Sequence, residues 1–498
     1  MAEKLYQLLV NSANQFSDKI AVEEAGGQSV SYADLLQLVQ SRMELLLTKD
    51  LVDSKIIGVL GPKNIDTLSL IFSIAGANKA YLPLDFNSPL SRIQKIISVA
   101  QIRFIFSDLS RKKDLESLGY NLYSTINSKW AMFENELVRE REVHPDLAYV
   151  LFTSGTTGIP KGVCVSDPAA IDFIHWATDH LELNAQHVFS SVAPFHFDLS
   201  VFDIFASVKS GAKLILFNSL QIAQPAFLVD SIKKHSISVW YSTPTTLRLM
   251  VEFGNYTQES SASLQHIIFA GESYPSSEFI KLQHNSTNKA RFYNWYGPTE
   301  TNVCTSFSVP QGNWNPQQAL PIGRATLQYE SKISDGDIEG TSQGELLMSG
   351  TSLMNGYLNN EQANQHAFVF IDGKKWYKTG DLVEWQSGEL VYKGRYDRMI
   401  KRNGYRIELN EIEVGLQSCA GLLFAAVVAF HLPESVKIVA FVSGINESDL
   451  IALRAELMKV LPAYMIPDKF IILDNIPLNS SQKTDYQALI HYAAEHFK

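Results

Sequence analysis

The sequence predicts an α/β protein: a large N-terminal domain of α/β subdomains with mostly parallel sheets plus a β-rich subdomain, followed by a small α+β C-terminal domain. Short β-rich runs alternate with helical patterns along most of the chain. The alternation is clear in a strand, helix and strand over 56–60, 65–74 and 80–84, and again over 213–217, 226–235 and 238–241. Such alternation is typical of parallel sheets covered by helices.

A change of pattern near residue 395 predicts a domain boundary. The glycine-rich stretch 322–393 reads as the antiparallel, β-rich subdomain, and the charged segment 394–398 follows it. The last hundred residues suggest a helix, a strand and a helix over 408–417, 425–430 and 448–459. We expect an N-terminal core over residues 1–395 and a mobile C-terminal lid domain over residues 396–498.

The composition is that of a soluble globular enzyme. Of 498 residues, 46% are hydrophobic and 19% are charged, with a net charge of −10. A negative net charge disfavours broad nucleic-acid binding and docking on anionic lipid. The N-terminus lacks the basic and apolar regions of a signal peptide, and the most apolar stretch, 419–430, is about half the length of a membrane span. We expect a cytoplasmic monomer with no nucleic-acid or membrane partner.

The three cysteines, Cys164, Cys304 and Cys419, are far apart and form no C-x-x-C pair. This usage fits a reducing compartment and predicts neither a zinc site nor a disulfide framework.

A hydroxyl-rich loop follows the apolar run 150–152. Residues 153–162 are almost all Gly, Ser, Thr or Lys, and this includes Lys161. Hydroxyls and backbone N–H groups can close around a polyphosphate, and the lysine adds a positive charge. The lysine does not have the spacing of a P-loop, so a kinase or GTPase of that type is excluded. A flexible linker is the alternative.

Further motifs occur in the order found in the adenylate-forming superfamily: 31–35, 296–300, 377–381 and 482–485. Nearly end to end, the chain resembles a free-standing amino-acid adenylation domain of the non-ribosomal peptide synthetase type. The resemblance implies a ligase that uses ATP and Mg²⁺, releases pyrophosphate and forms AMP.

The resemblance also implies a nucleotide site. Tyr296 would stack on adenine, Asn294 would read its amino group, and Asp381 would accept the ribose hydroxyls. Thr299 would meet the α-phosphate and Glu300 would hold Mg²⁺. The implied nucleotide-binding set is Thr153, Ser154, Gly155, Thr156, Thr157, Gly271, Glu272, Asn294, Tyr296, Gly297, Thr299, Asp381, Arg395 and Lys483, together with a tyrosine at position 393 to which no role is assigned. Ordinary turns at 296–300 and at Asp381 are the alternative.

The resemblance implies that Lys483, Thr153, Lys161 and Glu300 take part in catalysis. Lys483 would enter the site on the lid and bridge the substrate carboxylate and the transferred phosphoryl group. A fixed ammonium there stabilises charge that grows in the transition state. The family usually has Gly where this chain has Gln482, and a solvated surface lysine is the alternative. Asp397 stands at the family's hinge.

The motif 195–203 gives the clue to the substrate. In the family's amino-acid members, an aspartate at the position of Asp198 pairs with the substrate ammonium. A helix N-cap ahead of 199–205 is the alternative interpretation. The remaining implied lining has no charge, which suggests a small apolar side chain: Leu199, Phe202, Tyr241, Ile268, Ala270, Trp295, Val303 and Cys304.

This pocket resembles that of free-standing L-proline-activating enzymes most closely, and D-alanine ligases come second. Phe202 and Trp295 are larger than expected for proline. The chain ends soon after Lys483, so we expect the acceptor thiol on the phosphopantetheine arm of a discrete carrier protein. An acyl-CoA synthetase and a non-catalytic nucleotide-binding protein are alternatives; Asp198 argues against the first, and Gln482 favours the second.

Overall fold

In the computed structural model the described residues are 3–48, 51, 53–155, 158–312, 314–335, 338–339, 342–419, 421–432, 435–473, 477 and 484–497. The chain forms two compact units. The larger unit contains Met1–Phe86, Ala100–Phe152 and Gly162–Tyr396, and the smaller unit contains Asn87–Val99, Thr153–Lys161 and Asp397–Lys498. Every helix in the described part of the chain is too short or too polar to cross a lipid bilayer.

A nine-stranded sheet forms one half of the larger unit. In spatial order its strands are β16 (Arg324–Ala325), β15 (Thr305–Ser308), β14 (Arg291–Tyr296), β13 (His266–Phe269), β12 (Val239–Ser242), β10 (Val188–Ser191), β11 (Lys213–Leu216), β1 (Ile20–Glu24) and β2 (Ser29–Ser31). The pairs from β14 to β1 are parallel, and β15, β16 and β2 add antiparallel strands at the two edges.

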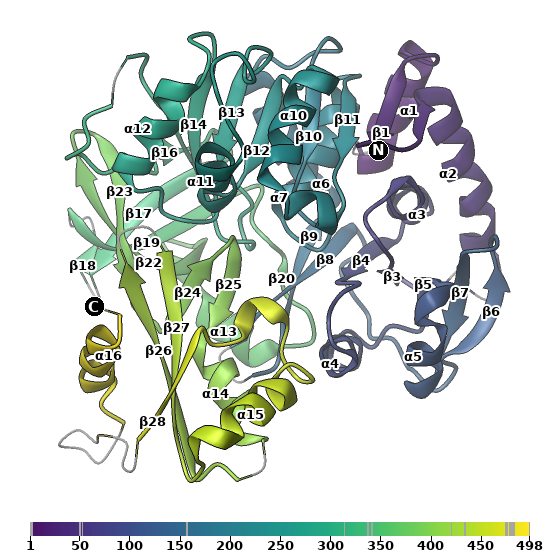
Figure 1. Ribbon diagram of the computed structural model, residues 1–498. Helices are drawn as coiled ribbons and strands as arrows, with labels where there is room; N and C mark the ends of the chain where they lie inside the picture. Colours follow the sequence, from purple (N-terminus) through teal and green to yellow (C-terminus); the bar gives the residue numbers. More distant parts are fainter. Residues whose placement is uncertain are drawn as a thin grey trace. The chain divides into compact units, whose positions relative to one another are not determined.

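Helices cover both faces of this sheet. On one face, Trp240, Ile267 and Phe269 share a core with apolar residues of α10 (Pro225–His235), α11 (Pro244–Phe253) and α12 (Ser276–Asn285) (Figure 1). On the other face, Tyr241 and Ile268 join a second core with α1 (Leu5–Gln15), α6 (Asp167–His180), α7 (Leu199–Val201), the π-helix η2 (Phe202–Ala206) and α8 (Ser207–Lys209). Alternating side chains of a strand point to opposite faces, so each strand contributes to both cores.

An eight-stranded sheet forms a second part of the larger unit. Its order is β20 (Gly356–Tyr357), β9 (Lys161–Ser166), β8 (Leu147–Thr153), β4 (Ala80–Leu84), β3 (Ile56–Leu60), β5 (Phe104–Asp108), β7 (Trp130–Glu134) and β6 (Asn121–Thr125). All residues of β3 and β4 are buried, as expected for parallel strands covered on both faces. Helix α3 (Ile65–Gly76) packs on β3 and β4, and α2 (Tyr32–Leu46) packs on α3; η1 (Leu109–Arg111) and α5 (Lys112–Ser117) follow β5 in the sequence.

The third sheet is antiparallel. It contains β18 (Ile338–Glu339), β17 (Tyr329–Asp335), β19 (Gln343–Gly350), β22 (Lys374–Gln386) and β21 (Phe368–Ile371), with β23 (Glu389–Arg395) paired to β22. Two short helices, α9 (Ser219–Ile222) and α13 (Glu361–Ala367), complete the larger unit. The antiparallel pairing over this stretch confirms the expected β-rich subdomain.

The smaller unit has cores of its own, formed by residues beyond 399. It contains most of α4 (Leu90–Ala100), the hairpin β24 (Met399–Arg402) and β25 (Tyr405–Glu408), α14 (Leu409–Gln417), the sheet β26 (Phe424–Leu432), β27 (Ser435–Ser443) and β28 (Lys469–Ile472), and η3 (Glu447–Asp449), α15 (Leu450–Leu457), η4 (Ala463–Met465) and α16 (Tyr486–Glu495). The predicted α/β class is confirmed, and the apolar stretch 419–430 supplies β26 rather than a membrane span.

A buried histidine predicts an acid-sensitive fold. Burial lowers the pKa of His266 from 6.5 to about 4, with further lowering by His187, Arg291 and His180. The unfolded chain therefore takes up a proton below about pH 6.5, where folded His266 is still neutral. Through this histidine the folded protein keeps its full stability above pH 6.5, and it loses stability as the pH falls towards 4.

We expect His266→Phe to reduce the fall in Tm between pH 6.5 and pH 4, measured by thermal unfolding across a pH series. The phenyl ring can keep the contact with Tyr293, whose ring centroid lies 5.9 Å from that of His266. His366→Gln, at an exposed position in α13, is the matched control and should leave the slope unchanged. Equal pH slopes in wild type and His266→Phe would contradict the assignment.

Candidate active site

The carboxyl ends of β12, β13 and β14 meet at one edge of the nine-stranded sheet. The register places Tyr241 opposite Ile268 and Ile268 opposite Tyr293. Tyr241, Ile268, Ala270 and Trp295 accordingly lie in the same core, on one face of the sheet. In open α/β sheets, ligands bind outside the carboxyl ends of the strands. The structure thus brings four of the predicted lining residues together where a ligand site is expected.

Three aromatic rings form the centre of this lining. Ring centroids are separated by 5.3 Å between Phe202 and Tyr241, 5.1 Å between Phe202 and Trp295, and 5.4 Å between Tyr241 and Trp295, all edge to face. Each residue is at most 2% exposed. Mutually packed rings leave little volume for a substrate side chain. Trp295 Nε1 is buried and has no hydrogen-bond partner in the described part of the chain.

Leu199 and Val303 belong to the same core as these rings, whereas Cys304 does not. Cys304 is fully buried in a separate cluster with Tyr296 and Tyr329. Its role as a lining residue stays a prediction.

Asp198 stands at the start of α7 but does not cap it. Its backbone is already helical, and its side chain accepts no capping hydrogen bond. Instead its Oδ2 accepts a hydrogen bond of 2.6 Å from the Thr299 hydroxyl, 101 residues away in sequence. The N-cap interpretation is therefore wrong. Burial raises the pKa of Tyr241 well above its ordinary value, and the nearby charges of Asp198 and Asp203 raise it further. The phenol therefore faces this carboxylate in its neutral form.

The motif 296–300 folds as a tight turn at the end of β14. A Cβ on Gly297 would lie 1.7 Å from the carbonyl oxygen of Asn302, so a larger residue does not fit this turn. Glu300 is 1% exposed, and its Oε1 accepts a hydrogen bond of 2.6 Å from the Tyr357 hydroxyl. Sequence reasoning missed Tyr357, because the two-residue strand β20 gives no motif or periodic signal.

Asp381 lies on β22 opposite Arg395 of β23. Its carboxylate is fully buried, pairs with the Arg395 guanidinium and accepts a hydrogen bond from the Tyr296 hydroxyl. Burial raises the pKa of Tyr296 well above its ordinary value, with a further contribution from the charge of Asp381, so the phenol remains a donor. The structure brings together three residues predicted to bind adenosine.

The expectation of a tyrosine at position 393 in the nucleotide site is wrong. Residue 393 is Lys393, and the tyrosine of this part of β23 is its neighbour, Tyr392. The Lys393 side chain is exposed, and its ammonium lies 3.0 Å from the Glu384 carboxylate of β22. Tyr392 is partly buried against the cluster that contains Tyr296. A shift of one residue along a strand moves a side chain to the opposite face, so Lys393 is a solvated cation and is removed from the nucleotide-binding set.

Asn294 and Glu272 are held by neighbouring groups. Asn294 Nδ2 donates to the carbonyl oxygen of Pro321 at 2.8 Å, and within the described chain we find no partner for its Oδ1. Glu272 Oε2 accepts from the Thr245 hydroxyl at 2.7 Å, and Gly271 before it has a φ of +88°. The amide of Asn294 thus presents an acceptor oxygen, which suits an adenine amino group.

The hydroxyl-rich loop belongs to the smaller unit. Thr153 Oγ1 is buried without a partner among the described residues, and the Ser154 hydroxyl donates to the Arg406 carbonyl at 2.6 Å. A Cβ on Gly155 would lie 1.9 Å from the carbonyl oxygen of Ile159, which explains the glycine. Lys161 begins β9. Thr156 and Thr157 lie outside the described residues.

Lys483 and Gln482 also lie outside the described residues, but the segment that follows them is well anchored. Asp485 caps α16 by accepting from the backbone N–H of Ala488 at 3.0 Å. The Arg398 guanidinium lies 3.5 Å from the ring centroid of Tyr486 and forms an ion pair of 2.8 Å with Glu413. Asp397 Oδ1 accepts from the backbone N–H of Met399 at 3.2 Å. The expected hinge and the start of α16 are thus joined through Arg398.

Comparison with known proteins is consistent with this arrangement. A family model described as AMP-binding enzyme matches residues 9–358. An L-proline–L-prolyl-carrier protein ligase of Streptomyces coelicolor is 32% identical over 497 residues, covering 93% of this chain and 92% of the relative. A D-alanine–D-alanyl carrier protein ligase of Bacillus licheniformis is 31% identical over 479 residues, covering 93% of this chain and 94% of the relative.

A solved structure shows the same fold. The Vibrio cholerae adenylation domain AlmE, in complex with glycyl-adenosine-5'-phosphate, has a TM-score of 0.84 and 24% identity, covering 99% of this chain and 98% of that chain. The family match spans more than half of the chain, and the relatives extend the similarity over nearly all of it. The chain therefore belongs to the family of AMP-binding enzymes.

Proposed function

We propose that this enzyme is an ATP-dependent amino acid–carrier protein ligase. It adenylates a small apolar amino acid and transfers the aminoacyl group to the phosphopantetheine thiol of a separate carrier protein. The observation that supports this most directly is the hydrogen bond of 2.6 Å between Thr299 and Asp198. It joins the candidate phosphate-binding motif to the candidate ammonium-binding carboxylate. Relatives named as carrier protein ligases over more than nine-tenths of the chain support the same reaction.

The residues present fit an adenine nucleotide. Asn294 Oδ1 suits the adenine amino group, and the Asp381 carboxylate can accept ribose hydroxyls besides its bonds to Tyr296 and Arg395, because an ionised carboxylate has about four acceptor positions. The Thr153 hydroxyl, which has no partner among the described residues, suits a phosphate oxygen. Glu300 would hold Mg²⁺, a hard cation that prefers carboxylate and phosphate oxygens.

In the first half-reaction the substrate carboxylate attacks the α-phosphorus of ATP, and pyrophosphate leaves. In the second, the carrier thiol attacks the aminoacyl carbonyl and AMP leaves. Asp198 would hold the ammonium throughout, and Lys483 would neutralise charge on the carboxylate and phosphoryl oxygens in the first step. We propose that the C-terminal residues turn about Asp397 between the two steps, a common way to separate two reactions in one site.

The lining favours a small side chain without charge. An ionised side chain beside Phe202, Tyr241 and Trp295 would be buried without a partner, which is costly. L-Proline is our first candidate, because the combination of Asp198, Tyr241 and Ala270 resembles proline-activating enzymes. D-Alanine is the second, because the mutual packing of the three rings leaves little volume.

A pyrophosphate-exchange panel with the twenty amino acids and D-alanine tests this function. Exchange should depend on an apolar amino acid, with L-proline or D-alanine strongest. The absence of exchange across the whole panel would contradict the proposal, and a preference for fatty acids would favour an acyl-CoA synthetase.

Asp198→Ala should reduce kcat/KM for the amino acid while KM for ATP stays nearly constant. Truncating one partner of a desolvated charge pair costs about 2–5 kcal/mol, or roughly 30-fold to several thousand-fold. Exchange kinetics with each substrate varied in turn give both constants. An equal loss with a carboxylic acid that lacks the α-amine would show that Asp198 does not recognise the ammonium.

Lys483→Ala should slow adenylation by about 10²–10³-fold, the usual effect of losing a group that stabilises transition-state charge. Transfer from preformed aminoacyl adenylate to a phosphopantetheine thiol should change far less. Single-turnover assays separate the two steps. Lys469→Ala is the matched control, because this lysine of the same unit contacts the backbone of His496, and both steps should be unaffected. Similar losses in both steps for Lys483→Ala would refute the assigned role.

A further inference from the structure

The half-buried Lys63 and the buried Asp203 have no binding or catalytic role in the site described above. Lys63 lies in the turn between β3 and α3, and Asp203 is the second residue of the π-helix η2. Asp203 is fully buried. Both residues belong to the larger unit, 140 positions apart in the sequence, and the charge of each acts on the other.

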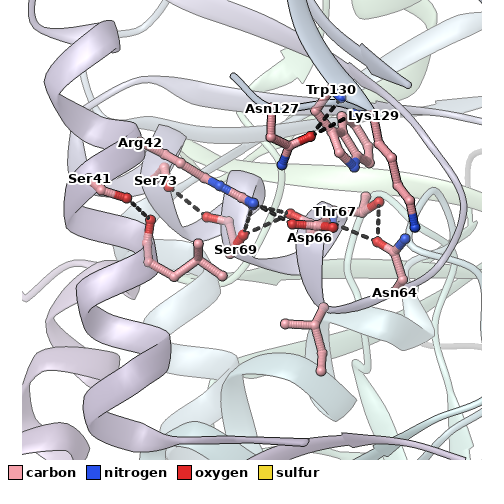
Figure 2. Close-up of polar contacts among 12 residues, drawn as sticks. Ser41, Arg42, Asn64, Asp66, Thr67, Ser69, Ser73, Asn127, Lys129 and Trp130 are labelled. Atoms are coloured by element: carbon pink, nitrogen blue, oxygen red, sulfur yellow. Dashed lines mark hydrogen bonds and ion pairs between the residues drawn. The ribbon is translucent and has the colours of Figure 1, made fainter. Parts of the chain in front are cut away.

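The backbone on either side of Lys63 is held rigidly. Asn64 caps α3, its Oδ1 accepting from the backbone N–H of Thr67 at 2.8 Å (Figure 2). The backbone N–H of Ile65 donates to Glu24 Oε1 at 2.9 Å. A Cβ on Gly61 would lie 2.0 Å from the Trp130 ring, so the turn packs directly on that ring. Lys63 therefore extends from a fixed support.

The first helical turn of α3 is fixed as well. Figure 2 shows Arg42 of α2 reaching Asp66 and Ser69 of α3. The Arg42 guanidinium donates to the Asp66 carbonyl at 2.7 Å and pairs with its carboxylate. These contacts tie the support of Lys63 to a second helix.

The Lys63 ammonium holds the segment that leads to Asp198. It donates to the carbonyl oxygens of Ser191 at 2.6 Å and Ala193 at 2.7 Å, at the end of β10. It also lies 5.6 Å from the centroid of the Phe195 ring. From there the chain turns at once into Asp198. Lys63 thus fixes the start of the turn.

Asp203 lies at the other end of the segment, in η2, where both carboxylate oxygens are buried without a hydrogen-bond partner among the described residues. Burial raises the pKa of its carboxyl well above the ordinary value, and Lys63 opposes this with its positive charge. Burial lowers the pKa of Lys63 to about 7, and Asp203 opposes that. The two charges thus favour each other at longer range, since neither Asp203 oxygen accepts a hydrogen bond within the described chain. Phe202, next to Asp203, contacts the Tyr241 and Trp295 rings.

We propose that Lys63 is a positioning residue that sets the Asp198 carboxylate for the substrate ammonium, by holding the backbone at Ser191 and Ala193, where the segment that leads to Asp198 begins. Lys63 itself does not touch the substrate. The inference rests on the proposed function, since it assigns Asp198 to the amino acid. A merely structural ion pair would lower stability without a selective effect on amino-acid binding.

Lys63→Met removes the charge and keeps the length of the side chain. We expect KM for the amino acid in pyrophosphate exchange to rise by at least about 10-fold, because small displacements of a binding group have large effects. KM for ATP should change by less than about 2-fold. Hydrogen–deuterium exchange of residues 192–200 should become faster in the same variant, whether or not an amino acid is bound.

Lys79→Met is the matched control. Lys79 is buried, and its ammonium likewise donates to two backbone carbonyls, of Leu51 at 2.6 Å and of Ser54 at 2.7 Å. Neither carbonyl belongs to the segment that leads to Asp198. This variant should lower Tm and leave both KM values and the exchange of 192–200 unchanged. If Lys63→Met does not fold, the double variant Lys63→Met, Asp203→Asn removes the unpaired carboxylate and should still show the raised KM.

The outcomes separate this inference from the proposed function. If the wild type shows no pyrophosphate exchange that depends on an amino acid, the proposed function is contradicted. Hydrogen–deuterium exchange of residues 192–200 then still tests whether Lys63 holds the turn. An active wild type, with a folded Lys63→Met variant of unchanged KM and unchanged deuterium exchange, overturns the role of Lys63 alone. A selective rise in KM that Lys79→Met does not reproduce supports it.

Discussion

The carboxylate of Asp198 is a negative charge at the border of a hydrophobic core, and the arrangement around it follows from that. A buried charge is tolerated when hydrogen bonds and an opposite charge compensate it. In the described structure, the Thr299 hydroxyl provides one hydrogen bond to Asp198. Under the proposed function, the substrate ammonium would add a positive charge beside it. The neutral aromatic rings of Phe202, Tyr241 and Trp295 keep the local dielectric constant low. A low dielectric constant would strengthen the attraction between Asp198 and a substrate ammonium, and it makes an ionised substrate side chain unfavourable.

The parallel sheet explains why these groups can meet at all. Strands β12, β13 and β14 run in the same direction, so the residues that follow each of them emerge at one edge. Trp295 therefore lies beside Tyr241, although long helical connections separate their strands in sequence, and Thr299 reaches Asp198. The turn that contains Asp198 follows β10, the next strand of the same sheet. Parallel pairing thus converts distant motifs into one site.

Local patterns were enough to predict the elements and not enough to predict their contacts. The strand 56–60 and the helix that follows it were recognisable because continuous apolar runs and helical periodicity are local properties. The bond between Thr299 and Asp198 was not predictable, since it depends on the pairing of whole strands. The N-cap interpretation of Asp198 failed for the same reason: a residue before an apolar run has the local signature of a cap, and only tertiary structure shows that its partner is elsewhere. Lys63 and Tyr357 gave no motif signal, and the motif 195–203 gave no sign that the charge of its Asp203 acts on Lys63, because these relations exist only after folding.

The distribution of the hydrophobic cores bears on how two half-reactions can share one chain. The cores of the C-terminal residues are formed by side chains beyond 399, and the cores around the nine-stranded sheet are formed by residues before that point. Most of the free energy of folding comes from burial within such cores. The proposed turn of the C-terminal residues about Asp397 would therefore leave each core intact. Under the proposed function, recognition of the amino acid then depends on a rigid support behind Asp198, whereas adenylation would depend on Lys483. In that proposal, two parts with separate cores would let the pocket stay rigid while the charge of Lys483 is withdrawn.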